Sequence, residues 1–541
     1  MALSLKAEQK ELLKIFKIEE QYVIPAYQRP YSWEYDQCFQ LYNDLTEACK
    51  ANEDYFIGNI IIAKSEANKE TLEVVDGQQR LTTLLLLIKT LSIFQPEMKV
   101  LNQILEQEDW EGSQKITRIK SDIFEAKDGI DLQSVLKYSK NDFEERFKQC
   151  TDKSENIDEK KCKNRFEINI LYFYKWLLFN SIKDNYIKDF ATFCLKKVYL
   201  LPIELTGPTQ KEANEKALII FETMNNRGMS LEDADIFKAE LYKKAQAINE
   251  EKIFIESWVN IKSSCEKLNL KIDDLFRYYS HIVRGLKGIT SSEKNLREFF
   301  LRETFSPFQL NKYKEILDDL SKIIEKIEFV NLQQRKDTES AKWLQLIESY
   351  TNQYPKFAVI TYLFINDLST DDSQFVDFLK SLVRYVYYQG STTRIKFEIY
   401  TIIKQVCLKQ KIDTYNMDLD LYDFNHLGRL KYGFALLAFY VDHETINDYY
   451  TDKLITLRDK SQLTGDWLNI NLDEVTDSLG NFVVLDMPQK NISFNKKIDY
   501  YKSSDIYKSD RFFSSNLTYE NFKNRDNHLK KNLVTFFKNS L

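Results

Sequence analysis

The 541-residue chain is poor in residues that break regular structure and in residues that cross-link it. Its 13 glycines and 8 prolines are few for this length, which disfavours disorder and an all-β fold rich in tight turns. Its 7 cysteines are odd in number and scattered, with no CxxC pair, which disfavours a disulfide framework and a zinc site. No stretch approaches the ~18 continuous apolar residues of a membrane span, and Met1–Lys10 lacks the apolar core of a signal peptide. We therefore expect a soluble, cytoplasmic protein that makes no membrane contact.

The sequence also lacks a net excess of positive charge. The formal net charge is −6, so the molecule has no overall basic excess, and any contact with nucleic acid must come from a local patch. Residues 489–541 hold 11 Lys and Arg against 5 Asp and Glu, and form the notable basic region of the sequence. Only 4 histidines are present, so few residues could serve as a general base near neutral pH.

Apolar residues are ample for packed interiors, at 43% hydrophobic and 14% aromatic. A chain of this length is expected to form two to four domains. The patterns predict an α+β protein that is mostly helical overall. We expect a mixed first domain over residues 1–230, a large helical domain over 231–415, and a small α+β domain over 416–541.

Three runs near the N-terminus predict strands because β-branched and aromatic residues cluster in them. They cover residues 21–27, 55–63 and 71–75. The turn signal Asp76-Gly77 ends the third strand, and apolar residues at helical spacing predict a helix from Arg80 onward.

Further along, residues 193–205 return to strand character. A helix, a polar loop and a second helix are expected over residues 215–245. Ser230 and Asp233 fit a capping box that would start this second helix.

The residues Asp76, Gly77, Gln78, Gln79 and Arg80 place an acid, a flexible glycine, two amides and a guanidinium at a predicted helix start. Free N–H groups and the helix dipole favour an anion there. Arginine can clamp a phosphate, the glutamine amides can contact a base or ribose, and aspartate can hold a metal ion or a water. The same residues would also make an ordinary helix cap with a surface salt bridge, and their spacing alone does not separate these alternatives. No GxxxxGK[ST] segment is present, which excludes a Walker-type site.

Two further polar clusters lie beside turn or helix signals. The stretch IPAYQRPYSW offers rings and a cation that could stack on or enclose a base, namely Tyr27, Gln28, Arg29, Tyr31 and Trp33. The stretch FETMNNRG offers Asn225, Asn226 and Arg227 before a glycine. A rigid loop packed on the core and ordinary loop capping are the plainer explanations of these two clusters.

Together, IPxYQRxYxW, DGQQR and FxxxNxRGxxLxxxD resemble, in this order over roughly residues 10–240, the motifs of the DUF262 family. Proteins of this family have a ParB/sulfiredoxin-like N-terminal domain. The family includes GmrSD-type and SspE-type restriction proteins, which act on phage DNA carrying modified bases or phosphorothioate linkages. The resemblance implies an anti-phage defence function similar to type IV restriction.

The resemblance also implies roles for individual residues. In this family the DGQQR segment is associated with nucleotide binding and hydrolysis, so ATP or GTP would bind at Asp76, Gly77, Gln78, Gln79 and Arg80. Asp76 and Arg80 would act in catalysis, with Mg²⁺ or Mn²⁺ as the metal. The resemblance adds contacts to nucleotide or modified DNA from the other two motifs, through Tyr27, Gln28, Arg29, Asn225 and Arg227, with Asp235 facing the same pocket.

Family members often end in a DUF1524 domain, an HNH-like nuclease. Such a site needs a histidine as general base, a polar residue that orients it, and an Asn or His that binds one divalent metal ion. Residues 478–501 resemble the second half of that domain, with Asn481 in the catalytic group and Asn491 or Asn495 on the metal side, near Lys497.

The first half departs from the family pattern, because the window 449–467 holds no histidine. His443 lies just before this window and is the candidate for a displaced base. His426 is further away, and His528 lies beyond the site. A lone histidine in a polar loop is also often structural or simply exposed to solvent.

Two hypotheses of different class follow. The first is an NTP-dependent defence enzyme that nicks double-stranded DNA, modified or not, through an HNH-like C-terminal domain. The alternative is a nucleotide- or DNA-modification-sensing module with a degenerate nuclease domain that assembles with a partner effector. Either could form a homodimer or join a second defence subunit. A purely structural helical scaffold would leave the three N-terminal motifs unexplained.

Overall fold

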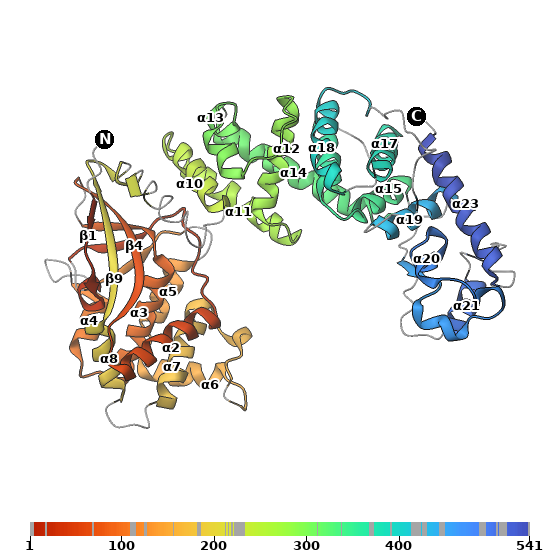
Figure 1. The fold of residues 1–541 in the computed structure, drawn as a ribbon. Coiled ribbons are helices and arrows are strands. Elements are labelled where there is room, and N and C mark those ends of the chain that lie inside the picture. Colours follow the sequence, from red (N-terminus) through yellow and green to blue (C-terminus); the bar gives the residue numbers. More distant parts are fainter. Residues whose placement is uncertain are drawn as a thin grey trace. The chain divides into compact units, whose positions relative to one another are not determined.

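The computed structural model forms two compact units, Met1–Val259 and Asn260–Leu541 (Figure 1). The residues that it describes are 5–541 without 17–18, 68–69, 109–114, 124–126, 155, 181–185, 211, 215, 218–219, 221–232, 311, 337, 367–372, 390–391, 413–423, 425–429, 443–449, 486–493, 505–506, 508–516 and 539–541. The predicted domain boundaries at residues 230 and 415 stay predictions.

The first unit is built on a seven-stranded mixed sheet with the order β1-β9-β4-β5-β3-β8, in which β2 also pairs with β9. β4 runs parallel to β9 and antiparallel to β5, while β5, β3 and β8 are parallel to one another. The strands are β1 (Leu5–Ala7), β2 (Lys10–Glu11), β3 (Gln21–Ile24), β4 (Tyr55–Ser65), β5 (Thr71–Asp76), β8 (Ile119–Ser121) and β9 (Val198–Gly207). A separate hairpin pairs β6 (Glu106–Glu108) with β7 (Lys115–Thr117).

The sheet is buried on both faces at β4, which explains the unbroken apolar run there. Ile60 and Ile62 point into the main core, whereas Ile61 packs on the other face with Val75 and Leu205. Alternation of side chains along a strand produces this division.

The main core lies between the sheet and a group of helices, with α3 (Gln78–Phe94) among them (Figure 1). α3 is apolar around most of its circumference, and residues Leu84–Leu87 are almost fully buried. It packs against α7, α4 and α8. The helices of this unit are α1 (Leu12–Phe16), α2 (Tyr35–Ala51), α3, α4 (Lys99–Leu105), α5 (Asp128–Leu136), α6 (Lys140–Cys150), α7 (Arg165–Asn180), α8 (Tyr186–Lys197) and α10 (Asp233–Gln246), and α11 (Glu251–Lys267) spans the division between the units.

The second unit is helical and ends in a small mixed region. Its helices include α12 (Ile272–Leu286), α13 (Pro307–Leu310), α14 (Tyr313–Gln333), α15 (Glu339–Glu348), α16 (Tyr354–Ile365), α17 (Ser373–Gln389), α18 (Thr392–Cys407), α19 (Lys431–Asp442), α20 (Leu472–Thr476), α21 (Phe494–Ser503) and α23 (Tyr519–Lys538). An antiparallel hairpin of β10 (Tyr450–Lys453) and β11 (Phe482–Leu485) precedes α21.

The prediction of an α+β, mostly helical fold is confirmed. The strands expected at 55–63 and 71–75 are β4 and β5, and the expected helix is α3, which begins at Gln78 rather than Arg80. The strand expected over 193–205 is wrong at its start, because α8 continues to Lys197 and buries Phe190, Phe193 and Cys194 at helical spacing. The capping serine, Ser230, lies outside the described residues.

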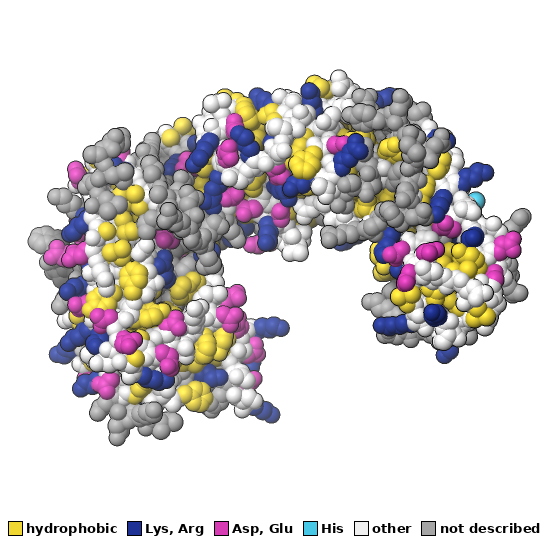
Figure 2. Space-filling model, in the orientation of Figure 1, with side chains coloured by type: hydrophobic (Ala, Val, Ile, Leu, Met, Phe, Trp, Pro, Cys, Tyr) yellow, Lys and Arg dark blue, Asp and Glu magenta, His cyan; other side chains and the backbone are white. Residues whose placement is uncertain are grey.

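Side chains of both charges are interspersed over the visible face, in keeping with a formal net charge of −6 (Figure 2). Among the described residues, no helix combines the length and the apolar composition that crossing a membrane requires.

Candidate functional site

The DGQQR segment joins β5 to α3 through a single residue, Gly77. Its φ of 89° is left-handed, a conformation that glycine adopts without steric cost. A Cβ at this position would lie 2.5 Å from Ile60 Cγ2 and 3.2 Å from the Asn59 carbonyl oxygen. Glycine is therefore required both by the backbone conformation and by the neighbouring strand.

The first turn of α3 begins without a side-chain cap. The first helical hydrogen bond runs from Leu81 N–H to the Gly77 carbonyl, at 2.9 Å. The N–H groups that precede Leu81 belong to Gln78, Gln79 and Arg80, and helix starts of this kind bind anions. The structure thus places the predicted anion site where a strand ends and a helix begins.

Asp76 and Arg80 face each other across this turn. Arg80 Nη2 lies 3.5 Å from Asp76 Oδ2, and both side chains are partly exposed. The guanidinium lies over Gly58 of β4, so closely that a Cβ on Gly58 would collide with Arg80 Nη1. Gly58 therefore makes the room in which the Arg80 guanidinium sits.

Burial raises the pKa of the Asp76 carboxyl above its ordinary value. The positive charges of Arg80 and Arg29 and the N–H of Gly77 act in the opposite direction and offset this only in part. Asp76 is thus a carboxylate held in a partly desolvated place beside a cation, a setting common at functional sites.

Gln78 forms hydrogen bonds to the loop that contains Tyr27, Gln28 and Arg29. Its Nε2 donates to Gln28 Oε1 at 3.2 Å and to the Arg29 carbonyl at 3.1 Å. Gln28 Nε2 in turn donates to the Val75 carbonyl at 2.9 Å. The two predicted motifs therefore meet, and their amide groups bind each other.

Gln79 continues the same network one residue further on. Its Nε2 donates to the Pro30 carbonyl at 3.1 Å, and its Oε1 accepts from Ser32 N–H at 2.9 Å. Both glutamines are buried. They line a cavity with room for about one water molecule. Their side chains thus hold the loop in place, and Asp76 and Arg80 are the more open groups of the segment.

Tyr31 connects this loop to α5, α3 and α7 through hydrogen bonds. Its N–H donates to Asp128 Oδ2 at 2.7 Å, and its hydroxyl lies 2.7 Å from Thr83 Oγ1. Asn169 of α7 donates to the same hydroxyl at 3.0 Å and to the Trp33 carbonyl at 2.8 Å. Asp128 and Asn169 are positioning residues that no motif in the sequence marked.

α10 lies against the other side of this loop. Lys238 is buried, and its Nζ donates to the Gln28 carbonyl at 3.2 Å. Tyr27 is also buried, its hydroxyl has no hydrogen-bond partner, and its ring lies 6.3 Å from that of Tyr242. Lys238 was missed by the sequence reasoning, although it follows Asp235 by three positions on the same helix.

The remaining predicted residues of the nucleotide pocket divide into two groups. Arg29 is exposed beside the glutamine network, and Asp235 lies in the first turn of α10. Asn225 and Arg227 lie outside the described residues.

In the second unit, Asn481 is fully buried. Its Oδ1 accepts from Ile455 N–H at 2.8 Å, and its Nδ2 donates to the carbonyls of Ile455, at 2.8 Å, and Thr476, at 3.1 Å. These bonds hold together the segments around β10 and β11, so the geometry gives Asn481 a positioning role. A catalytic role for it stays a prediction.

The other predicted nuclease residues are not placed. His443 and Asn491 lie outside the described residues, as does the side chain of Asn495 in α21. Lys497 of α21 is placed, and its Nζ lies 2.7 Å from Asp452 Oδ2 of β10. Helix and hairpin therefore meet through an ion pair.

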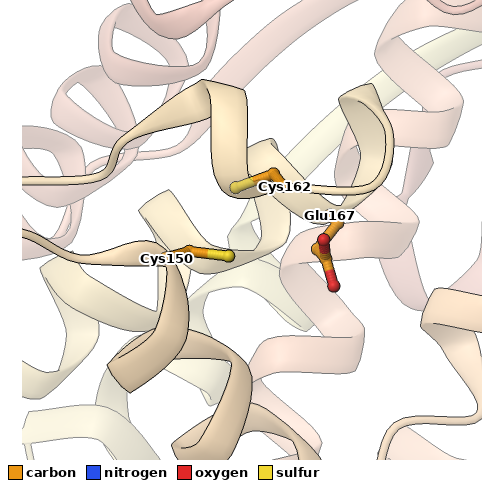
Figure 3. Close-up of side chains that lie close together, drawn as sticks. All are labelled: Cys150, Cys162 and Glu167. Carbon is orange, nitrogen blue, oxygen red and sulfur yellow. The ribbon is translucent and has the colours of Figure 1, made fainter.

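A cluster of potential metal ligands lies elsewhere in the first unit, where Cys150, Cys162 and Glu167 converge (Figure 3). Glu167 accepts hydrogen bonds from Arg146 at 2.7 and 3.0 Å, and also from the Tyr138 hydroxyl and Lys163 N–H. These four donors use the lone-pair directions of the carboxylate, which leaves none for a metal ion. The cluster is best explained as a buried Arg146–Glu167 ion pair with two thiols beside it.

Residues 11–242 match the family model described as the N-terminal domain of the GmrSD restriction endonuclease. No curated protein matches the chain significantly. The match lies within the first unit and includes the β4–β5–α3 site. The family whose N-terminal domain is matched is named for a restriction endonuclease. Residues 11–242 are thus similar to the GmrSD N-terminal domain, and the match does not extend to the rest of the chain.

Proposed function

We propose that the protein is an NTP-dependent defence endonuclease. ATP or GTP binds and is hydrolysed at the start of α3, and double-stranded DNA, modified or not, is nicked by the C-terminal region. The observation that carries the nucleotide half is the Arg80 guanidinium, held between Asp76 and Gly58 at an uncapped helix start.

In this proposal, residues of the first unit have different roles in NTP hydrolysis. Arg80 and the N–H groups at the start of α3 bind the phosphates, and they stabilise the charge that develops during transfer. Asp76 orients the water that attacks the terminal phosphorus. The bond from that phosphorus to the bridging oxygen breaks, the nucleoside diphosphate leaves with the bridging oxygen, and the water becomes part of inorganic phosphate after losing a proton to solvent. Gln28, Gln78 and Gln79 hold the loop that closes the site.

Mg²⁺ or Mn²⁺ fits this arrangement through Asp76, because a carboxylate oxygen is a ligand that both ions prefer. The ion would neutralise charge on the phosphates when bound. Its other ligands would come from the nucleotide and from water.

The nuclease half rests on the order β10, β11, α21, since HNH-like sites are built on a hairpin followed by a helix. In this proposal His443 is the general base, and Asn491 and Asn495 bind the divalent metal ion. Asn481 orients the strand segments around them through its three hydrogen bonds.

One observation favours the second candidate, a sensor with a degenerate nuclease that acts through a partner subunit. β10 carries no histidine, and the ammonium of Lys497 lies on its Asp452. A fixed cation between hairpin and helix supplies positive charge where a nuclease of this type binds its metal. Under this alternative a partner effector, such as a second defence subunit, carries out the cleavage.

The nucleotide half is tested by phosphate release from ATP and GTP with Mg²⁺ and then Mn²⁺. Arg80→Ala is expected to reduce the rate by about 10²-fold, the usual effect of removing one group that stabilises transition-state charge. Lys89→Ala, in the same helix α3 but away from its start, is the matched control. Equal rates for Arg80→Ala and the wild type would refute the assignment.

The proposed nuclease activity is tested by nicking of supercoiled plasmid. Unmodified plasmid is compared with plasmid whose bases are modified or whose backbone contains phosphorothioate linkages. His443→Ala should abolish nicking and leave NTP hydrolysis unchanged. Persistent nicking by this variant would exclude His443 as the base. Nucleotide hydrolysis without nicking of any of these DNAs would establish the sensor alternative.

A further inference from the structure

A stripe of cationic and imidazole side chains lies in the second unit, with His281 and Arg284 buried and Arg277 half-buried. Arg277, His281 and Arg284 follow one another at intervals of four and three on α12, so they share one face of that helix. α16 and α18 pack against α12. Their rings cover the stripe: Phe357 stacks on His281 at 4.1 Å between centroids, and Tyr400 lies 4.7 Å from the Arg284 guanidinium.

A single acid, Glu293, reaches this stripe within the described part of the chain. It accepts two hydrogen bonds from Arg277, at 2.8 and 3.0 Å, and one from the Tyr354 hydroxyl at 3.2 Å. His281 Nε2 lies 3.6 Å from it, yet neither ring nitrogen has a hydrogen-bond partner. Burial lowers the pKa of His281 to about 3, so this ring is neutral at physiological pH. Glu293 is therefore matched by Arg277 alone.

Arg284 remains without an acid. It is 3% exposed, its Nε has no hydrogen-bond partner, and Nη2 donates to the Ser291 carbonyl. No described carboxylate forms an ion pair with it. A buried charge without a counter-charge is unfavourable. Positive charge is thus in surplus at this place.

A cavity of about 370 Å³ opens beside the stripe, between α12, α18 and the loop that carries Glu293. This volume lies within the roughly 300–1,000 Å³ typical of small-ligand sites. Its lining includes Arg277, Glu293, Lys294, Lys396, Phe397 and Tyr400. Arg277 Nη1 makes none of the hydrogen bonds in the described structure and is free to bind a ligand.

The lining of this cavity includes a cation and a ring on neighbouring positions of α18. Lys396 is exposed and has no acidic partner among the described residues, whereas Lys294 pairs with Glu298 at 3.3 Å and with Glu303. Phe397 is 53% exposed, so its ring is open to a ligand. An exposed ring next to cations suits a ligand that combines an anion with a planar base.

We propose that this cavity binds a mononucleotide, with its phosphate held by Arg277 and Lys396 and its base on Phe397. The phosphate would pair with Lys396, the cation of the lining that has no acidic partner among the described residues, and the volume of the cavity leaves room for a base beside it. This site is separate from the nucleotide site at the start of α3 and does not depend on it.

The test is calorimetric titration of AMP into the full-length Arg80→Ala chain, in which the other nucleotide site is impaired. Lys396→Glu is expected to weaken AMP binding at least tenfold. Phe397→Ala is expected to weaken it several-fold while leaving the weaker binding of inorganic phosphate unchanged. Both side chains are exposed, so unchanged thermal unfolding confirms that each variant is folded. Lys411→Glu makes the same charge change at an exposed position just beyond α18 and is the control.

Three outcomes would overturn the proposal. The first is AMP binding of equal strength in Lys396→Glu and Lys411→Glu, and the second is no AMP binding to the parent chain at millimolar concentration. The third is a 5′-phosphorylated DNA duplex end that binds more tightly than AMP with the same dependence on Lys396, because the ligand would then be DNA rather than a free nucleotide.

Discussion

At the scale of residues, the absence of a side chain on Gly58 leaves space for the Arg80 guanidinium. Gly58 lies on β4 where the pairing with β9 shifts register, and its φ of 133° is unfavourable for other residues. The Arg80 guanidinium fills the space that a side chain there would take, and so stays close to Asp76. The position of the Arg80 guanidinium thus depends on Gly58 of the neighbouring strand β4.

Gly58→Ala is therefore expected to lower NTP hydrolysis about as much as Arg80→Ala, by roughly 10²-fold. The free energy of unfolding should fall by only about 1–3 kcal/mol, from backbone strain. Phosphate release and urea unfolding measure the two effects. Gly465→Ala is the matched control, because Gly465 also has a positive φ, of 69°, but no atom lies within 4 Å of its Cβ position. Full activity in Gly58→Ala would show that the exact place of the guanidinium is unimportant.

Asp76 gives a prediction on pH. Its pKa is raised in the folded chain by burial, so the protonated form favours folding, and this contribution is lost as the pH rises through the folded-state pKa. Asp76→Asn, which cannot ionise, should therefore raise the free energy of unfolding near pH 7, and by less near about pH 4. Urea unfolding at both values measures this. A variant less stable than wild type at pH 7 would show that the contact with Arg80 outweighs burial.

At the scale of elements, α3 was the most predictable part of the site. Its apolar run is long enough to identify a buried helix, and Asp76-Gly77 identifies the end of β5, because both signals are local. The bonds from Gln78 and Gln79 could not be foreseen, since their partners lie about 50 positions away along the chain. Asp128 had no signal at all, because its role exists only through its contact with Tyr31.

The burial of α3 around most of its circumference makes it a determinant of stability. Ile88→Ala should lower the free energy of unfolding by about 2–5 kcal/mol, the range for truncation of a fully buried aliphatic side chain. Ile130→Ala in α5 is the matched control, since Ile130 is 69% exposed and its truncation should cost less than about 1 kcal/mol. Similar losses in both variants would contradict the packing of α3.

At the scale of the whole molecule, the acidic net charge and the basic C-terminal stretch have opposite effects on the attraction of DNA. The formal net charge of −6 repels DNA, so attraction must be local. Lys523 and Lys531 of α23 are exposed and have no acidic partner among the described residues. They are the clearest candidates for phosphate contacts in the basic region.

Charge reversal of both lysines should weaken DNA binding and reduce its dependence on salt. Each lost phosphate contact is expected to lower the slope of log K against log salt concentration by about 1. Fluorescence anisotropy of a labelled duplex at several salt concentrations measures this. Lys140→Glu with Lys160→Glu, both exposed in the first unit, makes the same change in net charge and is the control. An equal loss in the control pair would mean that net charge alone governs the attraction.

The burial of α3 also determines how slowly its amide hydrogens exchange with solvent. Helix α3 packs in the main core of its unit, so its amide hydrogens can exchange with solvent only when much of that unit opens. The helix start proposed to bind nucleotide therefore has no separate local unfolding step, and it persists for as long as the unit stays folded. Slow, uniform deuterium uptake along α3, with or without nucleotide, is the signature of a site that is present before its ligand arrives.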